Sequence, residues 1–393
     1  MFFACGKLSS RCLRPRRTDH VWRESSIRVT YVIPTLDQSG AERQLALLAR
    51  FLLQSEVEVS VIALNRGGFY AQELSRAGVH VDVLEKRFRF DPLTYFRLRQ
   101  RLHELQPDII QSFLFSANSY VRLPGIAPKS SKVIVSERCV DTWKSGWQLR
   151  TDRWLSGRMQ AMTANSESVA DFYATKAGVP RNLMTVIPNG QPTPPVGAAE
   201  PASPSLREEI GLPADARIVG FVGRLAPQKC LADLVWAIQL LYQVIDNAYL
   251  VVVGEGPVRD QLAELAQSFD CRDRIIFLGH RTDAAALTKQ FDVFCLASSF
   301  EGMSNSLMEA MAAAVPVAVS DIPSNRELVE HEQTGLLFPH GDGAAMMKAL
   351  KRILEDAELA GRLGTAGFSL MSEHHSVEQM VQRHVDLYQE LCS

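Results

Sequence analysis

The stretch from residue 291 to residue 319 constrains the fold of this chain more than any other. It begins with an apolar run at 291–297, whose length and composition predict a buried strand. A polar loop and a helix follow, and a second apolar run at 315–319 predicts another strand, with its own polar loop behind it. Strands that alternate with helices favour a parallel α/β sheet, in which ligands bind at the loops that follow the strands.

The loop and helix after the first of these strands carry two glutamates eight positions apart, Glu301 and Glu309. The helix is predicted to begin near Ser304 or Asn305, because both are good N-cap residues. A strand, a tight loop and a helix N-terminus together bind anions, since free N–H groups and the helix dipole point at the ligand. Glu301 would then reach a hydroxylated group beyond a phosphate, and Glu309 would reach a ribose. Alternatively, the glutamates are a solvated loop charge and a helix-face charge.

A second loop supplies the positive charge that a phosphate site needs. Residues 217–222 predict a strand, and Arg224 and Lys229 follow it on a loop that contains Gly223. Arginine can grip two phosphate oxygens, and lysine adds a mobile point charge. Each of these two residues, taken alone, is more often an ordinary surface charge.

Residues 298–317 resemble a known family, the retaining GT-B glycosyltransferases of family four, which use nucleotide-sugar donors. That family reads S-x-x-E-G-x-x-x-x-x-x-E-A-M-A-x-x-x-P-V, and this segment matches it closely. Residues 222–229 match the family's V-G-R-L-x-x-x-K, with Cys230 where relatives usually have glycine. The resemblance covers most of the chain and is densest from 218 to 340. It implies an α/β protein of the GT-B fold, with two Rossmann-like, doubly wound domains facing a cleft.

The resemblance also implies a role for each candidate residue. Arg224 and Lys229 would bind the donor pyrophosphate and stabilise the leaving phosphate. Glu301 would contact the donor-sugar hydroxyls, and Glu309 would contact the ribose hydroxyls. Arg224, Lys229 and Glu301 are therefore the predicted catalytic residues. The other predicted donor-binding residues supply backbone N–H groups or loops near the base and sugar, and they are Gly254, Glu255, Gly279, His280, Gly302, Met303, Ser304, Asn305 and Ser306.

The N-terminal half begins with a similar strand-to-helix turn. A predicted strand at 27–33 leads to Gly40, Ala41 and Glu42, although the turn lacks the full Gly-x-Gly-x-x-Gly spacing. In the resembled family this loop reads G-G-A-E and lines the cleft near the donor sugar and the acceptor. Here Ser39 replaces the first glycine.

Many relatives also place a histidine near the reacting carbon, in a loop after a later strand. This chain has Gln111, Phe113 and Arg138 in the corresponding loops, so no catalytic histidine is carried over. Arg138 is predicted to contact the acceptor or a phosphate rather than to act as an acid or base, because arginine does not deprotonate.

The chain divides into five predicted segments. Residues 1–26 are basic and are expected to be a disordered tail, or the product of a start codon placed too early. An N-terminal Rossmann-like acceptor domain follows at 27–190, and a linker rich in Pro, Gly and Ala follows at 191–204. The C-terminal Rossmann-like domain at 205–375 would bind the nucleotide sugar. The resemblance implies that the helix in 376–393 packs back on the N-terminal domain.

Charge is unevenly divided between the two halves. Residues 1–190 hold 27 lysines and arginines against 17 acidic residues, a balance of +10, and residues 191–393 hold 15 against 27, a balance of -12. Two interpretations are compatible. The halves attract each other across a cleft, or the N-terminal half faces an anionic partner such as a membrane surface or a lipid phosphate.

A predicted helix at 92–105 belongs to this basic half. Basic and aromatic residues interleave at 86–90 and along the helix, which suits an interfacial surface. The alternative is a solvated basic face with Phe96, Leu98 and Leu102 packed inward.

Composition bounds the remaining possibilities. Seven scattered cysteines without metal spacing favour a reducing compartment and argue against disulfides or a zinc site. The sequence contains no run of 18 or more apolar residues, so it predicts no membrane span. We expect a cytoplasmic protein, with peripheral association at the inner face of the membrane left open. No Asp-x-Asp motif is present, so no obligatory metal and no cofactor beyond the substrate are expected.

The predicted function is transfer of a hexose from a UDP- or GDP-linked donor to a saccharide or lipid-linked saccharide, in surface polysaccharide or glycoconjugate synthesis. No nucleic acid partner is expected. Retention would follow from a same-face reaction, in which the leaving phosphate helps deprotonate the acceptor, or from a double displacement through a carboxylate. The alternative functions are a GT-B epimerase, a glycogen-type phosphorylase and a non-catalytic partner that kept the fold.

Overall fold

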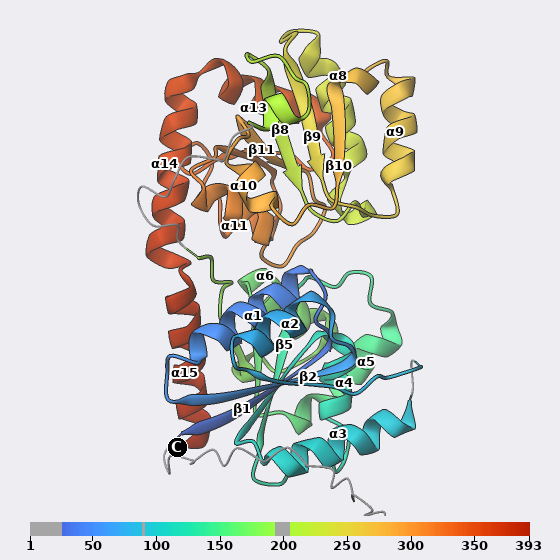
Figure 1. Cartoon of the computed structure of the whole chain (residues 1–393), viewed down its shortest axis with the longest axis vertical. Helices are drawn as coiled ribbons and strands as arrows, with labels where there is room; N and C mark the ends of the chain where they lie inside the picture. Colours follow the sequence, from blue (N-terminus) through green and yellow to red (C-terminus); the bar gives the residue numbers. More distant parts are fainter. Residues whose placement is uncertain (1–25, 89–90, 193–204) are drawn as a thin grey trace, which may run out of the picture.

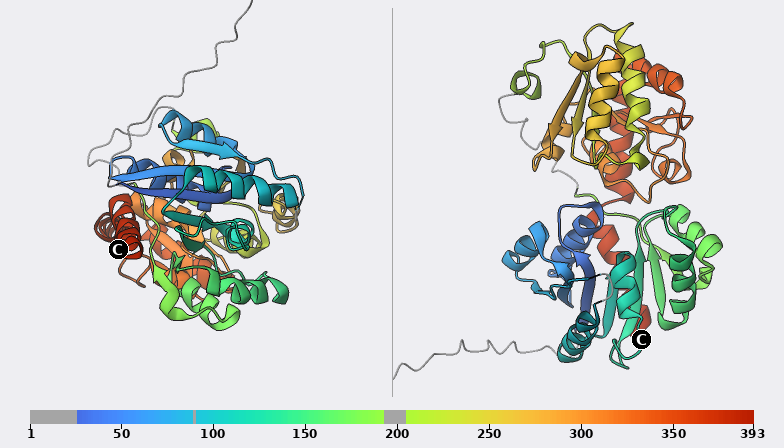
Figure 2. Two further views of the ribbon diagram at one scale, coloured as in Figure 1. Left: turned by 90° about the horizontal axis from the view of Figure 1, so that it is seen from below. Right: turned by 90° about the vertical axis from the view of Figure 1, so that its right-hand side faces the viewer.

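The computed structural model describes residues 26–88, 91–192 and 205–393. It contains two lobes, each with a central sheet flanked by helices, and one lobe stands above the other (Figure 1; Figure 2, right). The predicted tail lies almost wholly outside the described residues, and so does most of the predicted linker.

The N-terminal lobe is built on a seven-stranded sheet in the order β3-β2-β1-β4-β5-β6-β7. All neighbouring strands pair in parallel. The strands are β1 (Ile27–Thr35), β2 (Val57–Arg66), β3 (His80–Val83), β4 (Ile109–Phe113), β5 (Lys132–Glu137), β6 (Ala161–Ala164) and β7 (Met184–Val186). The main helices between them are α1 (Gly40–Leu52), α2 (Gly68–Arg76), α3 (Pro92–Leu105), α4 (Leu114–Val121), α5 (Gly146–Leu155) and α6 (Glu167–Phe172).

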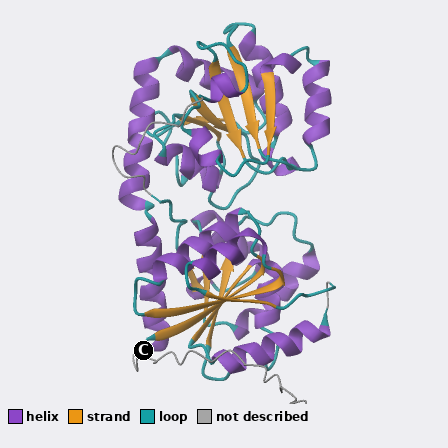
Figure 3. Ribbon diagram, in the orientation of Figure 1, coloured by secondary structure: helices purple, strands orange, loops and turns teal. Residues whose placement is uncertain are grey.

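The C-terminal lobe repeats this plan on a six-stranded parallel sheet, in the order β10-β9-β8-β11-β12-β13. Its strands are β8 (Arg217–Val222), β9 (Ala248–Val253), β10 (Ile275–Gly279), β11 (Val293–Leu296), β12 (Val317–Ser320) and β13 (Leu336–Phe338). Its helices are α7 (Leu206–Glu209), α8 (Leu231–Tyr242), α9 (Arg259–Ser268), α10 (Ala284–Thr288), α11 (Asn305–Ala312), α12 (Pro323–Arg326), α13 (Gly343–Glu355) and α14 (Ala357–His374). Figure 3 shows the strands inside each lobe and the helices outside.

The strand order reverses once in each sheet. The reversal lies between β1 and β4 in the first sheet and between β8 and β11 in the second. In open α/β sheets ligands bind beside such a switch point, at the carboxyl ends of the strands. The loops with Arg224 and Glu301 follow β8 and β11, so both lie at the switch point of the C-terminal sheet.

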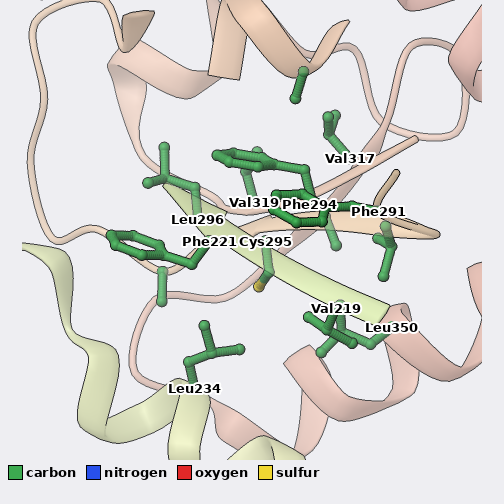
Figure 4. Packing of buried hydrophobic residues seen from close by; sticks show 14 of the residues in the cluster. Val219, Phe221, Leu234, Phe291, Phe294, Cys295, Leu296, Val317, Val319 and Leu350 are labelled. Atoms are coloured by element: carbon green, nitrogen blue, oxygen red, sulfur yellow. The ribbon is translucent and has the colours of Figure 1, made fainter. Parts of the chain in front are cut away.

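The core of the C-terminal lobe explains why its strands are almost continuously apolar. Side chains from β8, β11 and β12 are buried on both faces of the sheet, as parallel strands covered by helices require (Figure 4). Phe221, Phe294 and Leu296 are fully buried, and Leu234 and Leu350 cover the sheet from α8 and α13. This packing holds the loops beyond β8 and β11 on a rigid base.

The last helix, α15 (Val377–Cys392), follows α14 and runs down the side of the N-terminal lobe (Figure 1). Val377, Met380 and Leu387 are buried in the same apolar cluster as β1 and α1. The hydroxyl groups of Tyr388 and Tyr31 lie 2.9 Å apart in the core. The end of the chain is thereby part of the N-terminal lobe.

Two details of the structure differ from what the sequence indicated. Neither β7 nor β13 was predicted as a strand, because three residues are too few to show a period. Phe96 does not pack inward, since its exposed fraction is 63%, although Leu98 and Leu102 are fully buried.

Several general expectations can be compared with the described residues. The five cysteines among them, Cys139, Cys230, Cys271, Cys295 and Cys392, are all free. Across residues 26–88, 91–192 and 205–393, no helix combines the length and apolarity that a membrane span requires. The same part of the chain contains no group of three or more His, Cys, Asp or Glu side chains arranged to hold a metal ion.

Candidate active site between the lobes

Glu301 and Lys229 form a direct ion pair at the switch point of the C-terminal sheet. Lys229 Nζ donates to Glu301 Oε1, and the two side chains are 14% and 9% exposed. The Ser298 hydroxyl donates to the same carboxylate oxygen at 2.6 Å, and Gln228 Nε2 approaches the other at 3.4 Å. The structure therefore brings together two of the three predicted catalytic residues and fixes the carboxylate with additional donors.

Arg224, the third predicted catalytic residue, lies on the same loop and is exposed. Within the described part of the chain, its guanidinium makes no hydrogen bond or ion pair. The loop passes through Gly223 with φ 155°, and an added Cβ there would lie 3.9 Å from Lys229 Cε. A free guanidinium and a paired ammonium thus follow the same strand, as a phosphate site requires.

The loops after β9 and β10 join this edge through their backbones. Gly254 N donates to the Gly279 carbonyl at 2.8 Å, and Leu225 N donates to the Glu255 carbonyl at 2.9 Å. Gly254 has φ 135°, and an added Cβ would lie 2.0 Å from the Gly223 carbonyl oxygen, so only glycine fits there. The side chains of Glu255 and His280 are exposed at the rim of these loops.

The N-terminus of α11 faces the other lobe. Ser304 is the N-cap, as predicted, and its hydroxyl accepts from Leu307 N at 3.5 Å. Asn305 and Ser306 begin the helix, so their N–H groups have no carbonyl partner within it. Met303 is buried and its carbonyl accepts from Asn189 of the N-terminal lobe at 3.0 Å. These backbone donors and the helix dipole form an anion-binding end.

The side chain of Asn305 bridges the two lobes. Its Nδ2 donates to the Gly40 carbonyl at 3.0 Å, and its Oδ1 accepts from Gln44 Nε2 at 2.9 Å and from Asn189 Nδ2 at 2.8 Å. Gly40 is the first residue of α1, so the N-termini of α1 and α11 meet at this point. The structure therefore brings together the predicted Gly40 loop and the predicted donor loop.

Glu309 also pairs with the opposite lobe. Arg43, on the first turn of α1, binds its carboxylate through Nη1, and the side chains are 22% and 14% exposed. Burial raises the pKa of Glu309 and the charge of Arg43 opposes that shift. Arg43 was not among the predicted residues, although its place next to the Gly40-Ala41-Glu42 motif was a usable signal.

Gly302 allows a close backbone approach between the lobes. It forms an isolated antiparallel bridge with Cys139, and an added Cβ would lie 2.1 Å from the Arg138 carbonyl oxygen. The Arg138 guanidinium donates to Asn189 Oδ1, and burial lowers its pKa to about 10. Arg138 thus lies at the interface between the lobes.

The other N-terminal candidates support the site rather than line it. Glu42 is 4% exposed, and it accepts from Thr35 Oγ1 at 2.9 Å and from the Ser39 hydroxyl, so it braces the loop before α1. Ala41 is half-buried beside it. Gln111 and Phe113 are buried in the sheet, and Gln111 Nε2 donates to Ser136 Oγ at 2.8 Å. Neither of these two reaches the interface.

This arrangement defines a two-lobed α/β protein with cationic side chains and a helix N-terminus where its lobes meet. A family model described as glycosyl transferases group 1 matches residues 203–369, and one described as glycosyltransferase family 4 matches residues 38–193. The two matches take in both lobes and more than half of the chain. The chain therefore belongs to the family-four glycosyltransferases, and it is a glycosyltransferase of the GT-B type.

Individual relatives agree with this assignment. LpsD of Rhizobium meliloti strain 1021, a lipopolysaccharide core biosynthesis glycosyltransferase, is 25% identical over 374 residues, which cover 89% of this chain and 95% of LpsD. The 2-deoxystreptamine N-acetyl-D-glucosaminyltransferase of Streptomyces fradiae is 29% identical over 246 residues, 57% of each chain.

A solved structure supports the fold. The crystal structure of Anabaena HepE in complex with UDP-glucose has a TM-score of 0.80 and 22% identity, and the match covers 93% of this chain and 100% of HepE. This likeness confirms the predicted α/β fold class with two Rossmann-like lobes.

Proposed function

We propose that this glycosyltransferase moves a hexosyl group from a UDP-linked donor to a saccharide or lipid-linked saccharide, with retention of anomeric configuration. The observation that carries the proposal is the Lys229–Glu301 pair beside the exposed Arg224 and the N-terminus of α11. Cationic groups beside a buried carboxylate match a sugar diphosphate, which offers an anion next to a hydroxylated ring. HepE was crystallised with UDP and with UDP-glucose, which favours UDP over GDP as the nucleotide.

Each side chain has a proposed role that its surroundings support. Arg224 and Lys229 bind the pyrophosphate, and the first N–H groups of α11 complete the phosphate site. Glu301 accepts hydrogen bonds from the sugar hydroxyls through its second oxygen, since Lys229 and Ser298 occupy the first. Glu309 accepts hydrogen bonds from the ribose hydroxyls. Its carboxylate is then shared between the ribose and Arg43.

The reaction places its greatest demand on charge stabilisation. The bond between the anomeric carbon and the phosphate oxygen breaks, and negative charge builds on the departing nucleotide. Fixed donors at that position stabilise the charge without reorganising. We favour the same-face reaction, in which the leaving phosphate accepts the acceptor proton, because Glu301 is already bound by Lys229 and Ser298. No obligatory metal enters this proposal.

The acceptor is proposed to be lipid-linked and presented at the inner face of the membrane. The basic balance of the N-terminal half supports this, because anionic headgroups attract lysine and arginine. The name of LpsD, a lipopolysaccharide core enzyme, agrees with a role in surface polysaccharide synthesis.

The proposal is tested by measuring UDP release from UDP-glucose and UDP-N-acetylglucosamine in turn, with the anomeric configuration of the product read by NMR. We expect release with at least one donor, retention in the product, and no loss of rate with EDTA. Lys229→Ala and Glu301→Gln should each lower kcat by at least about 100-fold. Lys348→Ala, an exposed lysine on α13, is the matched control and should leave the rate unchanged. An inverted product, or equal rates in Lys229→Ala and Lys348→Ala, would overturn the proposal.

A further inference from the structure

The N-terminal lobe contains a pocket that the proposed reaction does not use. It has a volume of about 450 Å³ and lies between α3, α4 and α5, which lie on one side of that lobe (Figure 1). Its lining is largely apolar and aromatic, with Tyr95, Phe115, Tyr120, Leu123, Trp147 and Trp154 among the side chains. Pockets of about 300–1,000 Å³ are large enough to bury a small apolar ligand.

Exposed large apolar side chains lie in the pocket lining, and others lie on or next to the helices that enclose it. Trp147 and Trp154 line it and are 44% and 67% exposed, and Trp143, just before α5, is 62% exposed. On α3, Leu93 and Phe96 are 54% and 63% exposed. Soluble proteins rarely leave so many large apolar side chains together in water, so this surface is built to be covered. Tryptophan in particular favours the boundary between water and hydrocarbon.

Basic side chains accompany these aromatics. Arg150 lies between Trp147 and Trp154 on α5, and its spacing of three and four residues from them places all three on one helix face. Arg158 lies over the Trp154 ring, 5.8 Å from its centroid, and Lys86 lines the pocket.

The acidic side chain in the pocket lining already accepts hydrogen bonds from the protein itself. Asp91 is the acidic lining residue, and it is 2% exposed. Its carboxylate accepts from Arg87 N, Leu93 N and the Thr94 hydroxyl, at 3.0–3.1 Å. The surface that meets the pocket mouth is therefore apolar and positive, which is complementary to an anionic amphiphile.

We propose that this pocket binds an acyl chain of an anionic phospholipid, while Trp147 and Trp154 lie in the membrane interface and Arg150 and Arg158 contact headgroup phosphates. A bilayer lipid supplies both the chain and the negative charge that the surface fits. The site is separate from the Lys229–Glu301 pair, and it would hold the enzyme at the membrane where the proposed acceptor resides.

The test is binding of the full-length protein to phosphatidylglycerol vesicles and to phosphatidylcholine vesicles, followed by flotation and by tryptophan emission. We expect anionic vesicles to bind at least about tenfold more tightly, with a blue shift and with quenching by brominated acyl chains. Trp147→Ser with Trp154→Ser should lower the affinity by at least about tenfold. Ser119→Phe, which fills the pocket from α4 and keeps both tryptophans, should lower quenching by the brominated chains, because an acyl chain can no longer enter between them.

Trp236→Ser is the matched control, because Trp236 is 39% exposed on α8 in the other lobe. It should bind vesicles like the unchanged protein. Each variant is checked for an unchanged melting temperature and for unchanged UDP release from a soluble donor. Loss of vesicle binding with normal UDP release thus separates this inference from the proposed reaction.

Three results would overturn the inference. One is equal binding to neutral and anionic vesicles, and another is unchanged vesicle binding in Trp147→Ser with Trp154→Ser. The third is a light-scattering mass showing that the protein dimerises and that this pair of substitutions makes it monomeric. The surface would then be an interface between copies of the chain.

Discussion

Gly302 is a residue at which the backbones of the two lobes approach closely, and its lack of a side chain can be tested directly. Gly302→Ala places a Cβ 2.1 Å from a backbone oxygen, which cannot move as a flexible side chain can. We expect the Cys139 bridge to break and kcat to fall by at least about tenfold, because the adjoining Glu301 shifts with it. The matched control is Gly157→Ala, where an added Cβ meets nothing within 4 Å. Equal activity of the two variants would contradict this explanation of Gly302.

Among single residues, the sequence predicted those that share a short motif and missed those that meet across the lobes. Glu301 and Ser304 follow from strand, loop and helix signals within one segment, and Lys229 follows from the same signals in another. Arg43 and Asn189 gain their roles only when α1 and the end of the first lobe meet α11, and such non-local contacts leave no periodic signal. The pairing of Arg43 with Glu309 therefore could not be predicted from either motif alone.

Among the elements, the β5–α5 connection is held by a buried cluster of charges. Lys144 Nζ lies 3.1 Å from Asp152, 3.3 Å from Asp141 and 3.5 Å from Glu137, and it donates to the Tyr173 hydroxyl at 2.6 Å. Burial by itself lowers the pKa of Lys144, but the three carboxylates raise it overall. The cluster fixes the loop that carries Arg138 to the interface.

Lys144→Ala would leave these carboxylates without their shared cation. Breaking a buried ion pair by removing one partner costs about 3–5 kcal/mol, so we expect a loss of that size in the free energy of unfolding. Urea unfolding of the variant measures it, and Lys129→Ala, an exposed lysine in the same lobe, is the control. A loss below about 1 kcal/mol would show that the cluster does not hold the loop.

The docking of α15 predicts a pH dependence of stability. Burial lowers the pKa of His384 to about 4, and its Nδ1 donates to the Met380 carbonyl at 2.9 Å. Between pH 6.5 and pH 4 the unfolded chain binds a proton that the folded chain does not, so stability falls as the pH falls through this window. The loss attributable to His384 is at most about 3 kcal/mol.

Urea unfolding at pH 7 and at pH 4.5 tests this expectation. His384→Gln should show a smaller loss of stability between the two pH values than the unchanged protein. His340→Gln, at an exposed histidine, should show the same loss as the unchanged protein. An unaltered pH dependence in His384→Gln would contradict the assignment.

Elements with a clear period were predicted closely, including α3 at its observed bounds and the N-cap of α11. The expectation that Phe96 packs inward from α3 was wrong. Phe96 lies two positions from both Thr94 and Leu98, which belong to the buried stripe of the helix. Two positions turn the helix by about 200°, so a residue there points away from the core. That exposed ring lies on α3, one of the three helices that enclose the pocket.

At the scale of the whole molecule, both lobes present their switch points to each other. The predicted GT-B architecture was confirmed because the alternation of strands and helices and the family motifs all led to it. The lobe contacts through Asn305, Gly302 and Glu309 set the geometry in which a donor would bind. Binding of a nucleotide between them is the central claim about this molecule.

The most direct test is thermal unfolding with saturating UDP, GDP and ADP in separate experiments, for the unchanged protein, Lys229→Ala and Lys348→Ala. A nucleotide at about 100 times its Kd stabilises the folded state by about 2.7 kcal/mol, which gives a measurable rise in Tm. We predict that UDP raises the Tm of the unchanged protein and of Lys348→Ala, and that the rise largely disappears in Lys229→Ala. If none of the three nucleotides raises the Tm, or if Lys229→Ala retains the full rise, the assigned phosphate site is wrong.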